Sequence, residues 1–202
     1  MKNMKKTLCL LLAVLMTGSL LAGCGKKVDD NADSKKVFTV GIDAEYPPFS
    51  YLGDDGSYTG FDIEIAQAAC DQLGWEMKVF PVNWEQKLTQ LDAKECDCIW
   101  SGMTILDSMK EAGYTLSAPY YDNTQVIMVK EGSDIKSSAD LAGKVVAVQL
   151  GTSGDTLLSE DGDLESLTAT FKSLVRSDSF LKCFTELSGG AVGGVIVDKP
   201  VA

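Results

Sequence analysis

The stretch VFTVGIDAEYPPFSYLGDDGSYTGFDIEIAQAACDQLG, residues 37–74, decides the fold class. It opens with a short β-branched run, which is typical of a strand. Two consecutive prolines then force a loop, and an Asp-Gly pair predicts a hairpin turn. From residue 62 the apolar side chains recur at helical spacing, and Gly74 is a suitable cap for that helix. The stretch therefore predicts a strand that leads through a loop and a hairpin into a helix.

The rest of the chain repeats this alternation. The predicted strands cover residues 76–82, 96–100, 124–129, 144–150, 168–174 and 191–198, and the predicted helices 84–93, 138–143, 153–160 and 177–187. Strands that alternate with helices favour an α/β fold with mostly parallel sheets. Two such runs, joined by an extended segment, predict two lobes. We assign residues 37–123 to lobe 1, and residues 124–202 to a hinge strand and lobe 2.

Polar or aromatic residues follow many of these strands. In open α/β sheets, ligands bind outside the carboxyl ends of the strands. The candidates are Asp43, Tyr46, Trp84, Ser101, Gly102, Thr104, Thr152, Ser153 and Asp198. Each also has a purely structural interpretation, as a turn or helix cap, a core aromatic or a solvated strand end. Their recurrence at one edge favours a ligand cleft.

These residue types suit a zwitterionic amino acid. The carboxylate of Asp198 can bind an ammonium group. The amides of Thr152 and Ser153, at the start of a helix, can bind a carboxylate. Tyr46 and Trp84 can hold a side chain between their rings. Two lobes joined by a hinge can close over such a ligand.

The N-terminus has the features of an export signal. Three lysines precede an apolar run, residues 8–23, which is short for a membrane span. A retained membrane helix is the alternative. The run closes on LLAGC, which resembles a bacterial lipobox, so residues 1–23 are a predicted lipoprotein signal peptide. Cys24 would then carry lipid, including palmitate, that anchors the protein to the membrane. Residues 24–36 lack an apolar period and are predicted to form a flexible tether.

Charge argues against a nucleic-acid partner. The chain has 18 basic and 29 acidic residues, a net charge of −11. Cleavage after residue 23 removes three lysines and leaves 15 basic against 29 acidic residues, or −14. Binding to nucleic acid needs clustered cations. A soluble domain held outside the cell fits this charge.

Cysteine chemistry is left open by the sequence. Beyond Cys24 the chain holds Cys70, Cys96, Cys98 and Cys183, and it has no histidine. Disulfides are permitted in an exported protein, and a zinc site would require all four thiols to converge. We predict buried thiols and no metal.

At this point the chain resembles the extracellular solute-binding proteins, family 3, of polar amino-acid ABC importers. The resemblance runs from Phe38 to Ala202. Its motifs are GIDAEYPPFSY, GFDIEIAQAACDQLG, WEQKLTQLDAKECDCIWSGMTI, SAPYY, DLAGKVVAVQLGTSG and GVIVDKPVA. It implies a type II periplasmic-binding-protein fold that closes on its ligand and delivers it to a membrane permease, as a monomer without cofactor or catalysis. It also implies stacking by Tyr46 and Trp84, and hydrogen bonds to the ligand from Ser101, Gly102 and Thr104.

Two departures from the family pattern stand out. Family members carry an arginine after the MT motif that grips the ligand carboxylate. Here that position falls on Met109 or Lys110, depending on the direction of counting. Lys110 would offer the carboxylate a point charge but not the two parallel hydrogen bonds of an arginine. The alternative interpretation is that Lys110 is a solvent-exposed helix residue with no role in binding. Family members also continue beyond Ala202 to cross the hinge again, so we expect an incomplete lobe 2 and low stability.

Two other functions remain open. The same fold hosts dehydratases of cyclohexadienyl acids, for which Asp43 or Glu45 would supply the acid or base. The chain could also be the ligand-binding domain of a sensor. The lipid anchor and the importer-type motifs favour a binding protein.

Overall fold

The structure, a computed structural model, describes residues 35–202. The predicted signal peptide, the lipidation site at Cys24 and nearly all of the predicted tether lie outside the described residues. Within residues 35–202, no helix has the length and apolar character needed to cross a membrane.

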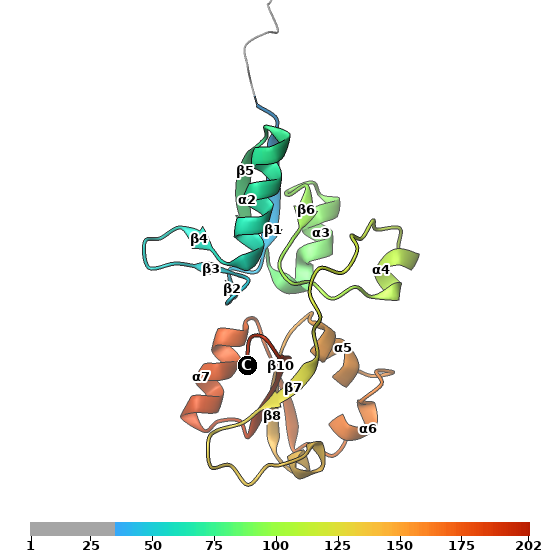
Figure 1. The fold of residues 1–202 in the computed structure, drawn as a ribbon. Helices are drawn as coiled ribbons and strands as arrows, with labels where there is room; N and C mark the ends of the chain where they lie inside the picture. The colour runs from blue at the N-terminus through green and yellow to red at the C-terminus, as the bar shows by residue number, and fades with distance from the viewer. Residues whose placement is uncertain (1–34) are drawn as a thin grey trace, which may run out of the picture. The chain divides into compact units, whose positions relative to one another are not determined.

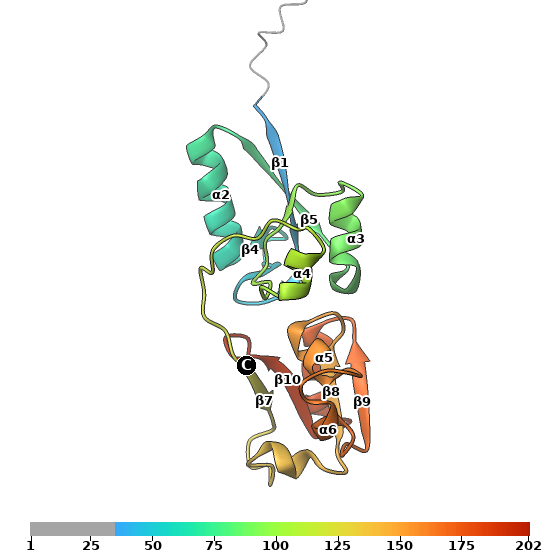
Figure 2. The same ribbon diagram turned by 90° about the vertical axis from the view of Figure 1, so that its right-hand side faces the viewer.

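The first sheet is built around the predicted first strand. β1 (Val37–Ile42) lies between β5 (Glu76–Pro81) and β6 (Cys98–Ile99), and pairs with both in parallel. Helix α2 (Phe61–Leu73) covers one side of this sheet and α3 (Lys87–Asp92) the other (Figure 2). The core of lobe 1 forms where the inner residues of β1 meet the apolar face of α2. Gly74, with φ of 69°, ends α2 in the left-handed conformation, as predicted.

A small antiparallel sheet follows β1. It contains β2 (Glu45–Tyr46), β3 (Ser50–Leu52) and β4 (Tyr58–Thr59). The predicted hairpin is therefore confirmed between β3 and β4, with Gly56 at a φ of 80° in its turn. This sheet brings Tyr46 to the edge of lobe 1.

The second sheet has the order β7-β10-β8-β9. Its strands are β7 (Gln125–Met128), β10 (Gly194–Asp198), β8 (Val145–Gln149) and β9 (Ser173–Ser177). Only β7 is antiparallel to its neighbour. In Figure 1, α7 (Phe180–Gly189) lies on one side of this sheet, and α5 (Ser153–Leu158) and α6 (Glu165–Thr168) on the other. The predicted α/β fold with two mostly parallel sheets is confirmed; the lobe boundary at 123/124 stays a prediction.

Some predicted elements are shifted. The strand predicted at 168–174 is wrong, because Thr168 closes α6 and strand β9 begins only at Ser173. Phe171, the apolar residue that suggested the strand, packs against the lobe 2 core from a turn. The helix predicted from residue 84 begins as a 3-10 turn (Trp84–Gln86), which the side chain of Asn83 caps by accepting a hydrogen bond from the amide of Gln86. The strand predicted at 96–100 is reduced to β6.

The shorter elements lie at the connections. These are α4 (Asp107–Glu111) and a 3-10 turn (Ser138–Leu141), and the second begins where a helix was predicted. The four thiols of the described region are free. Cys183 lies in the core of lobe 2, whereas Cys98 packs against the core of lobe 1. The thiols therefore do not converge, and residues 35–202 contain no cluster placed to hold a metal ion.

Candidate functional site

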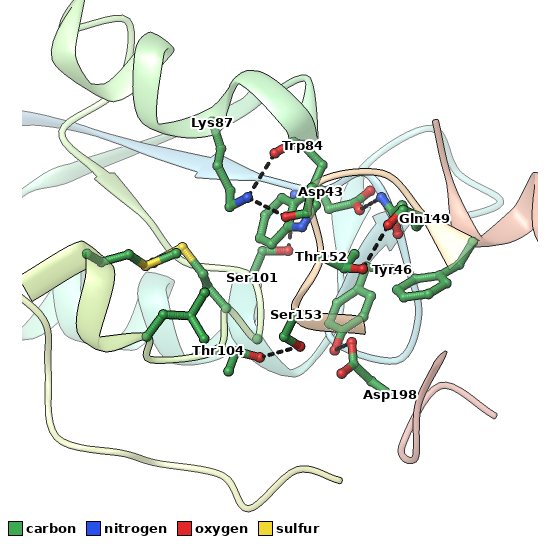
Figure 3. Close-up of a pocket in the computed structure, with 16 residues that line it drawn as sticks. Asp43, Tyr46, Trp84, Lys87, Ser101, Thr104, Gln149, Thr152, Ser153 and Asp198 are labelled. Carbon is green, nitrogen blue, oxygen red and sulfur yellow. Dashed lines mark hydrogen bonds between the residues drawn. The ribbon is translucent and has the colours of Figure 1, made fainter. Parts of the chain in front are cut away.

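One pocket collects the strand ends of both sheets (Figure 3). Every site residue predicted from the sequence lines it except Lys110. The lining residues are Asp43, Tyr46, Trp84, Lys87, Ser101, Gly102, Met103, Thr104, Leu106, Met109, Gln149, Gly151, Thr152, Ser153, Phe180 and Asp198. Convergence at one place follows from topology, because the carboxyl ends of parallel strands share an edge of their sheet.

Hydrogen bonds cross the pocket from lobe 1 to lobe 2. The Tyr46 hydroxyl donates to Oδ2 of Asp198 at 2.9 Å, and the Thr104 hydroxyl to Oγ of Ser153 at 3.1 Å. In the other direction, Nε2 of Gln149 donates to Oδ2 of Asp43 at 2.6 Å. These contacts hold the polar groups of the two lobes against each other.

The cavity left between these groups has a volume of about 30 Å³. That is room for a water molecule or two and is too small for an amino acid. For a ligand of that size to fit between these groups, the hydrogen bonds across the pocket must break. The same side chains then become available to the ligand.

Two glycines allow neighbouring residues to pack closely around the pocket. Gly102 has φ of 57°, and a Cβ atom there would lie 2.6 Å from Cε1 of Tyr46. Gly151 has φ of 74°, and its Cβ atom would lie 2.8 Å from the Cα atom of Glu85 in lobe 1. Any side chain at either position would be strained and would push the neighbouring residue away.

Asp198 forms one polar end of the pocket. It is buried at the end of β10 and accepts hydrogen bonds from Tyr46, from Asn123 and from Gln125. Gln125 also donates to Oγ of Ser153 at 3.0 Å, which links Asp198 to Ser153. Burial, followed by the charge of Asp198, raises the pKa of Tyr46, so the phenol stays protonated as a donor.

Asp43 forms the other polar end. Its side chain is 7 % exposed, and it accepts from the amide of Glu45 at 2.9 Å as well as from Gln149. Burial raises the pKa of this carboxyl, and the hydrogen bond from Gln149 opposes the rise. Ser101 and Ser50 hold the backbone of Asp43 through hydrogen bonds of 3.0 and 2.7 Å. Ser101 is thus a brace for Asp43 as well as a lining residue.

Lys87 is a pocket residue that the sequence interpretation missed. Its side chain is 6 % exposed, and its Nζ donates to the backbone oxygens of Trp84 at 3.0 Å and Gly151 at 2.8 Å. Burial lowers its pKa to about 8, although the charge of Asp43 acts in the opposite direction. The only sequence signal was its position three residues after Trp84, on the same face of the helical turn.

The place expected for a carboxylate-binding arginine holds no cation. Met109 is buried and lines the pocket, whereas Lys110 is exposed and pairs with Asp107 at 2.8 Å. Of the two candidate positions, only Met109 lines the pocket. The predicted role of Lys110 in binding is not supported by its position, because Lys110 itself lies outside the pocket lining.

The aromatic and hydroxyl residues have local partners. The ring of Tyr46 stacks on Phe49 at a centroid distance of 5.2 Å and on Phe180 at 5.9 Å. Its stacking on a ligand therefore stays a prediction. The Thr152 side chain caps α5 by accepting from the amide of Asp155 at 3.2 Å. Tyr46 is therefore a core aromatic as well as a pocket residue, and Thr152 is a helix cap as well as a pocket residue.

A two-lobed α/β structure with a polar pocket between the lobes defines the class of hinged ligand-binding proteins. Residues 38–187 match the family model described as bacterial extracellular solute-binding proteins, family 3. The chain belongs to this family.

Known relatives bind different amino acids. The L-cystine-binding protein TcyJ of Escherichia coli (strain K12) is 40% identical over 155 residues, which are 73% of this chain and 58% of TcyJ. The arginine-binding extracellular protein ArtP of Bacillus subtilis (strain 168) is 38% identical over 149 residues, 74% of this chain and 57% of ArtP. The chain thus spans less than two thirds of these relatives' length.

Solved structures confirm the fold. The ancestral amino acid-binding protein AncCDT-1, a precursor of cyclohexadienyl dehydratase, matches with a TM-score of 0.75 and 32% identity. The match covers 82% of this chain and 71% of AncCDT-1. The type II binding-protein fold, predicted from the motifs, is therefore confirmed.

Proposed function

We propose that the protein captures a free amino acid between its two lobes and delivers it to the permease of an ABC importer. The observation that carries this proposal is the convergence of buried carboxylates, hydroxyls and amides from both lobes on one pocket. A zwitterion is recognised by partners of both kinds, an anion for its ammonium and hydrogen-bond donors for its carboxylate. The pocket supplies both.

Asp198 is the partner for the ammonium group. It already gathers donors from Tyr46 and Gln125, and a ligand ammonium would take the place of one of them. The carboxylate would bind near Thr104 and Ser153, whose hydroxyls now bond to each other. Since Met109 lies where an arginine is expected, neutral donors would hold the carboxylate at this end.

Closure on the ligand follows from the size of the cavity. The pocket of about 30 Å³ cannot hold an amino acid while all the hydrogen bonds across it are formed. The ligand would bind to separated lobes and then bring them together, since the pocket residues come from both sides. A permease that recognises the closed form would receive only loaded protein.

The location and the state of the chain belong to the same proposal. Lipid on Cys24 would hold the protein outside the cytoplasm, within reach of the permease. A single chain contains both halves of the pocket, which supports action as a monomer. The net negative charge supports a small-molecule ligand over nucleic acid.

Isothermal titration calorimetry with L-cystine, L-arginine, L-histidine and L-glutamine tests this function. At least one of these amino acids should bind to the purified protein, and the heat should vanish when Asp198 is replaced by alanine. Absence of binding by these four and by every other amino acid tested would contradict the proposal. Turnover of prephenate or arogenate would instead establish the dehydratase alternative, which the likeness to AncCDT-1 and the buried Asp43 keep open.

A further inference from the structure

The pocket has a second charged end that a simple amino acid would leave unused. Asp43 and Lys87 both line it, and each is more than nine-tenths buried. Figure 3 shows Asp43, Lys87 and Gln149 on one side of the pocket, and Asp198, Ser153 and Thr104 on the other. The lining also includes the ring of Tyr46 and the apolar side chains of Met103 and Leu106.

The charges at this second end have only neutral partners. Asp43 holds Gln149 and a backbone amide, and Lys87 holds two backbone carbonyls. Among the ion pairs of residues 35–202, none joins Lys87 to Asp43. An ammonium group has three N–H donors, and Lys87 uses two of them. Burial of a charge without an opposite charge in contact is costly, which favours a ligand that brings the missing charges.

A buried, unpaired hydrogen-bond acceptor on Gln149 is a second observation that favours a ligand at this end of the pocket. Its side chain is fully buried and lines the pocket, yet its Oε1 atom has no hydrogen-bond partner among the described residues. A buried acceptor without a donor destabilises the structure, because it has lost its hydrogen bonds to water. The amide group of Gln149 contacts the Asp43 carboxylate, so this oxygen and that carboxylate can together accept an ammonium group, and Lys87 with its free donor lines the same pocket.

The geometry points to a ligand with two zwitterionic ends: a diamino dicarboxylic acid whose second ammonium binds Asp43 and Gln149 and whose second carboxylate binds Lys87. This inference rests on the proposed function and narrows its substrate class. L-cystine and meso-diaminopimelate belong to the class. Each charge of such a ligand meets an opposite charge or a polar partner.

Ligands with one charged side chain fit less well. The guanidinium of L-arginine would pair with Asp43 but face the ammonium of Lys87. The carboxylate of L-glutamate would pair with Lys87 but face Asp43. The two pocket charges therefore select against either kind of ligand, since like charges in a buried site repel strongly.

Two reciprocal variants test the inference by calorimetry. Lys87→Met should weaken L-cystine binding at least tenfold and strengthen L-arginine binding, because it leaves Asp43 without a competing cation. Asp43→Asn should weaken L-cystine and L-arginine and favour L-glutamate. Lys110→Met, an exposed lysine outside the pocket, is the matched control and should change none of these affinities.

The possible outcomes distinguish failure of the double-ended ligand from failure of the proposed binding function. If the wild type binds L-cystine or meso-diaminopimelate more tightly than L-arginine, L-glutamine and L-glutamate, and the variants shift preference as stated, the inference holds. If L-arginine or L-glutamine binds and neither double-ended ligand does, the inference is wrong and the proposed function survives. Unchanged preference in both folded variants would also overturn it. If no amino acid binds, the proposed function itself fails.

Discussion

The replacement Gly151→Ala tests whether the lobes meet in the ligand complex as they do in this structure. Gly151 lies in lobe 2 with φ of 74°, and an added Cβ atom would stand 2.8 Å from the Cα atom of Glu85 in lobe 1. Backbone cannot yield as a flexible side chain can, so the lobes would have to move apart at this point. The substitution therefore acts against closure.

The magnitude has two parts. Alanine in the left-handed conformation costs about 1–2 kcal/mol, and this strain is present in lobe 2 whether the lobes are apart or together. The contact with Glu85 adds about 1–3 kcal/mol in the closed form alone. Only the second part lowers affinity, and it corresponds to roughly 5- to 150-fold weaker binding.

Gly143→Ala is the matched control. Gly143 also lies in lobe 2 with φ of 68°, but an added Cβ atom there meets nothing within 4 Å. Both variants should lower the melting temperature by similar amounts, whereas only Gly151→Ala should weaken ligand binding in calorimetry. Normal affinity in a folded Gly151→Ala variant would refute the reasoning, because it would mean that the bound lobes do not meet at Glu85.

Three further predictions concern charge and the cleft. Asp198→Ala and Trp84→Ala should each weaken binding by at least about tenfold, or about 1.4 kcal/mol; normal binding in both would show that the cleft is assigned wrongly. Burial raises the pKa of Asp62, which is fully buried, above the ordinary 3.8, so the folded state retains its proton longer. The wild type should then lose stability relative to Asp62→Asn as the pH rises above 3.8, and parallel melting curves between pH 4 and 7 would contradict this. The pKa of Lys87 is lowered from 10.5 to about 8, so the folded state releases its proton first. The free energy of unfolding of the wild type, relative to Lys87→Met, should therefore rise between pH 8 and 10.5. Denaturant unfolding at several pH values in this range measures it, and a constant difference would contradict the prediction.

Local signals were sufficient for most of the fold. The β-branched run of β1 and the apolar spacing and final glycine of α2 depend on neighbouring residues only, and the structure has them where they were predicted. The strand near residue 170 was misplaced because Phe171 is apolar for tertiary reasons, as it packs on the lobe 2 core from a turn. Short apolar runs do not distinguish a strand from a buried turn.

In the pocket, too, some features could be predicted from the sequence and others depend on tertiary packing. The rule that ligands bind at the carboxyl ends of parallel strands places Asp43, Trp84 and Asp198 together without knowledge of any contact. The sequence also showed that no arginine stands at the position where the family pattern places one after the MT motif. It could not decide between Met109 and Lys110, because consecutive helix residues point about 100° apart and only packing shows which of the two faces the pocket.

Sequence alone determined the fold class, the two lobes and the strand-end residues, because periodicity and turn chemistry are local properties. Tertiary structure decided which charges are buried and what they touch. A lysine three residues after a tryptophan reads as an ordinary solvated helix residue, and a glutamine at a strand end as a polar cap. Only the approach of lobe 2 buries Lys87 against Gly151 and sets Gln149 against Asp43. Burial and opposite charge at long range in the sequence then turn these residues into the second end of the pocket.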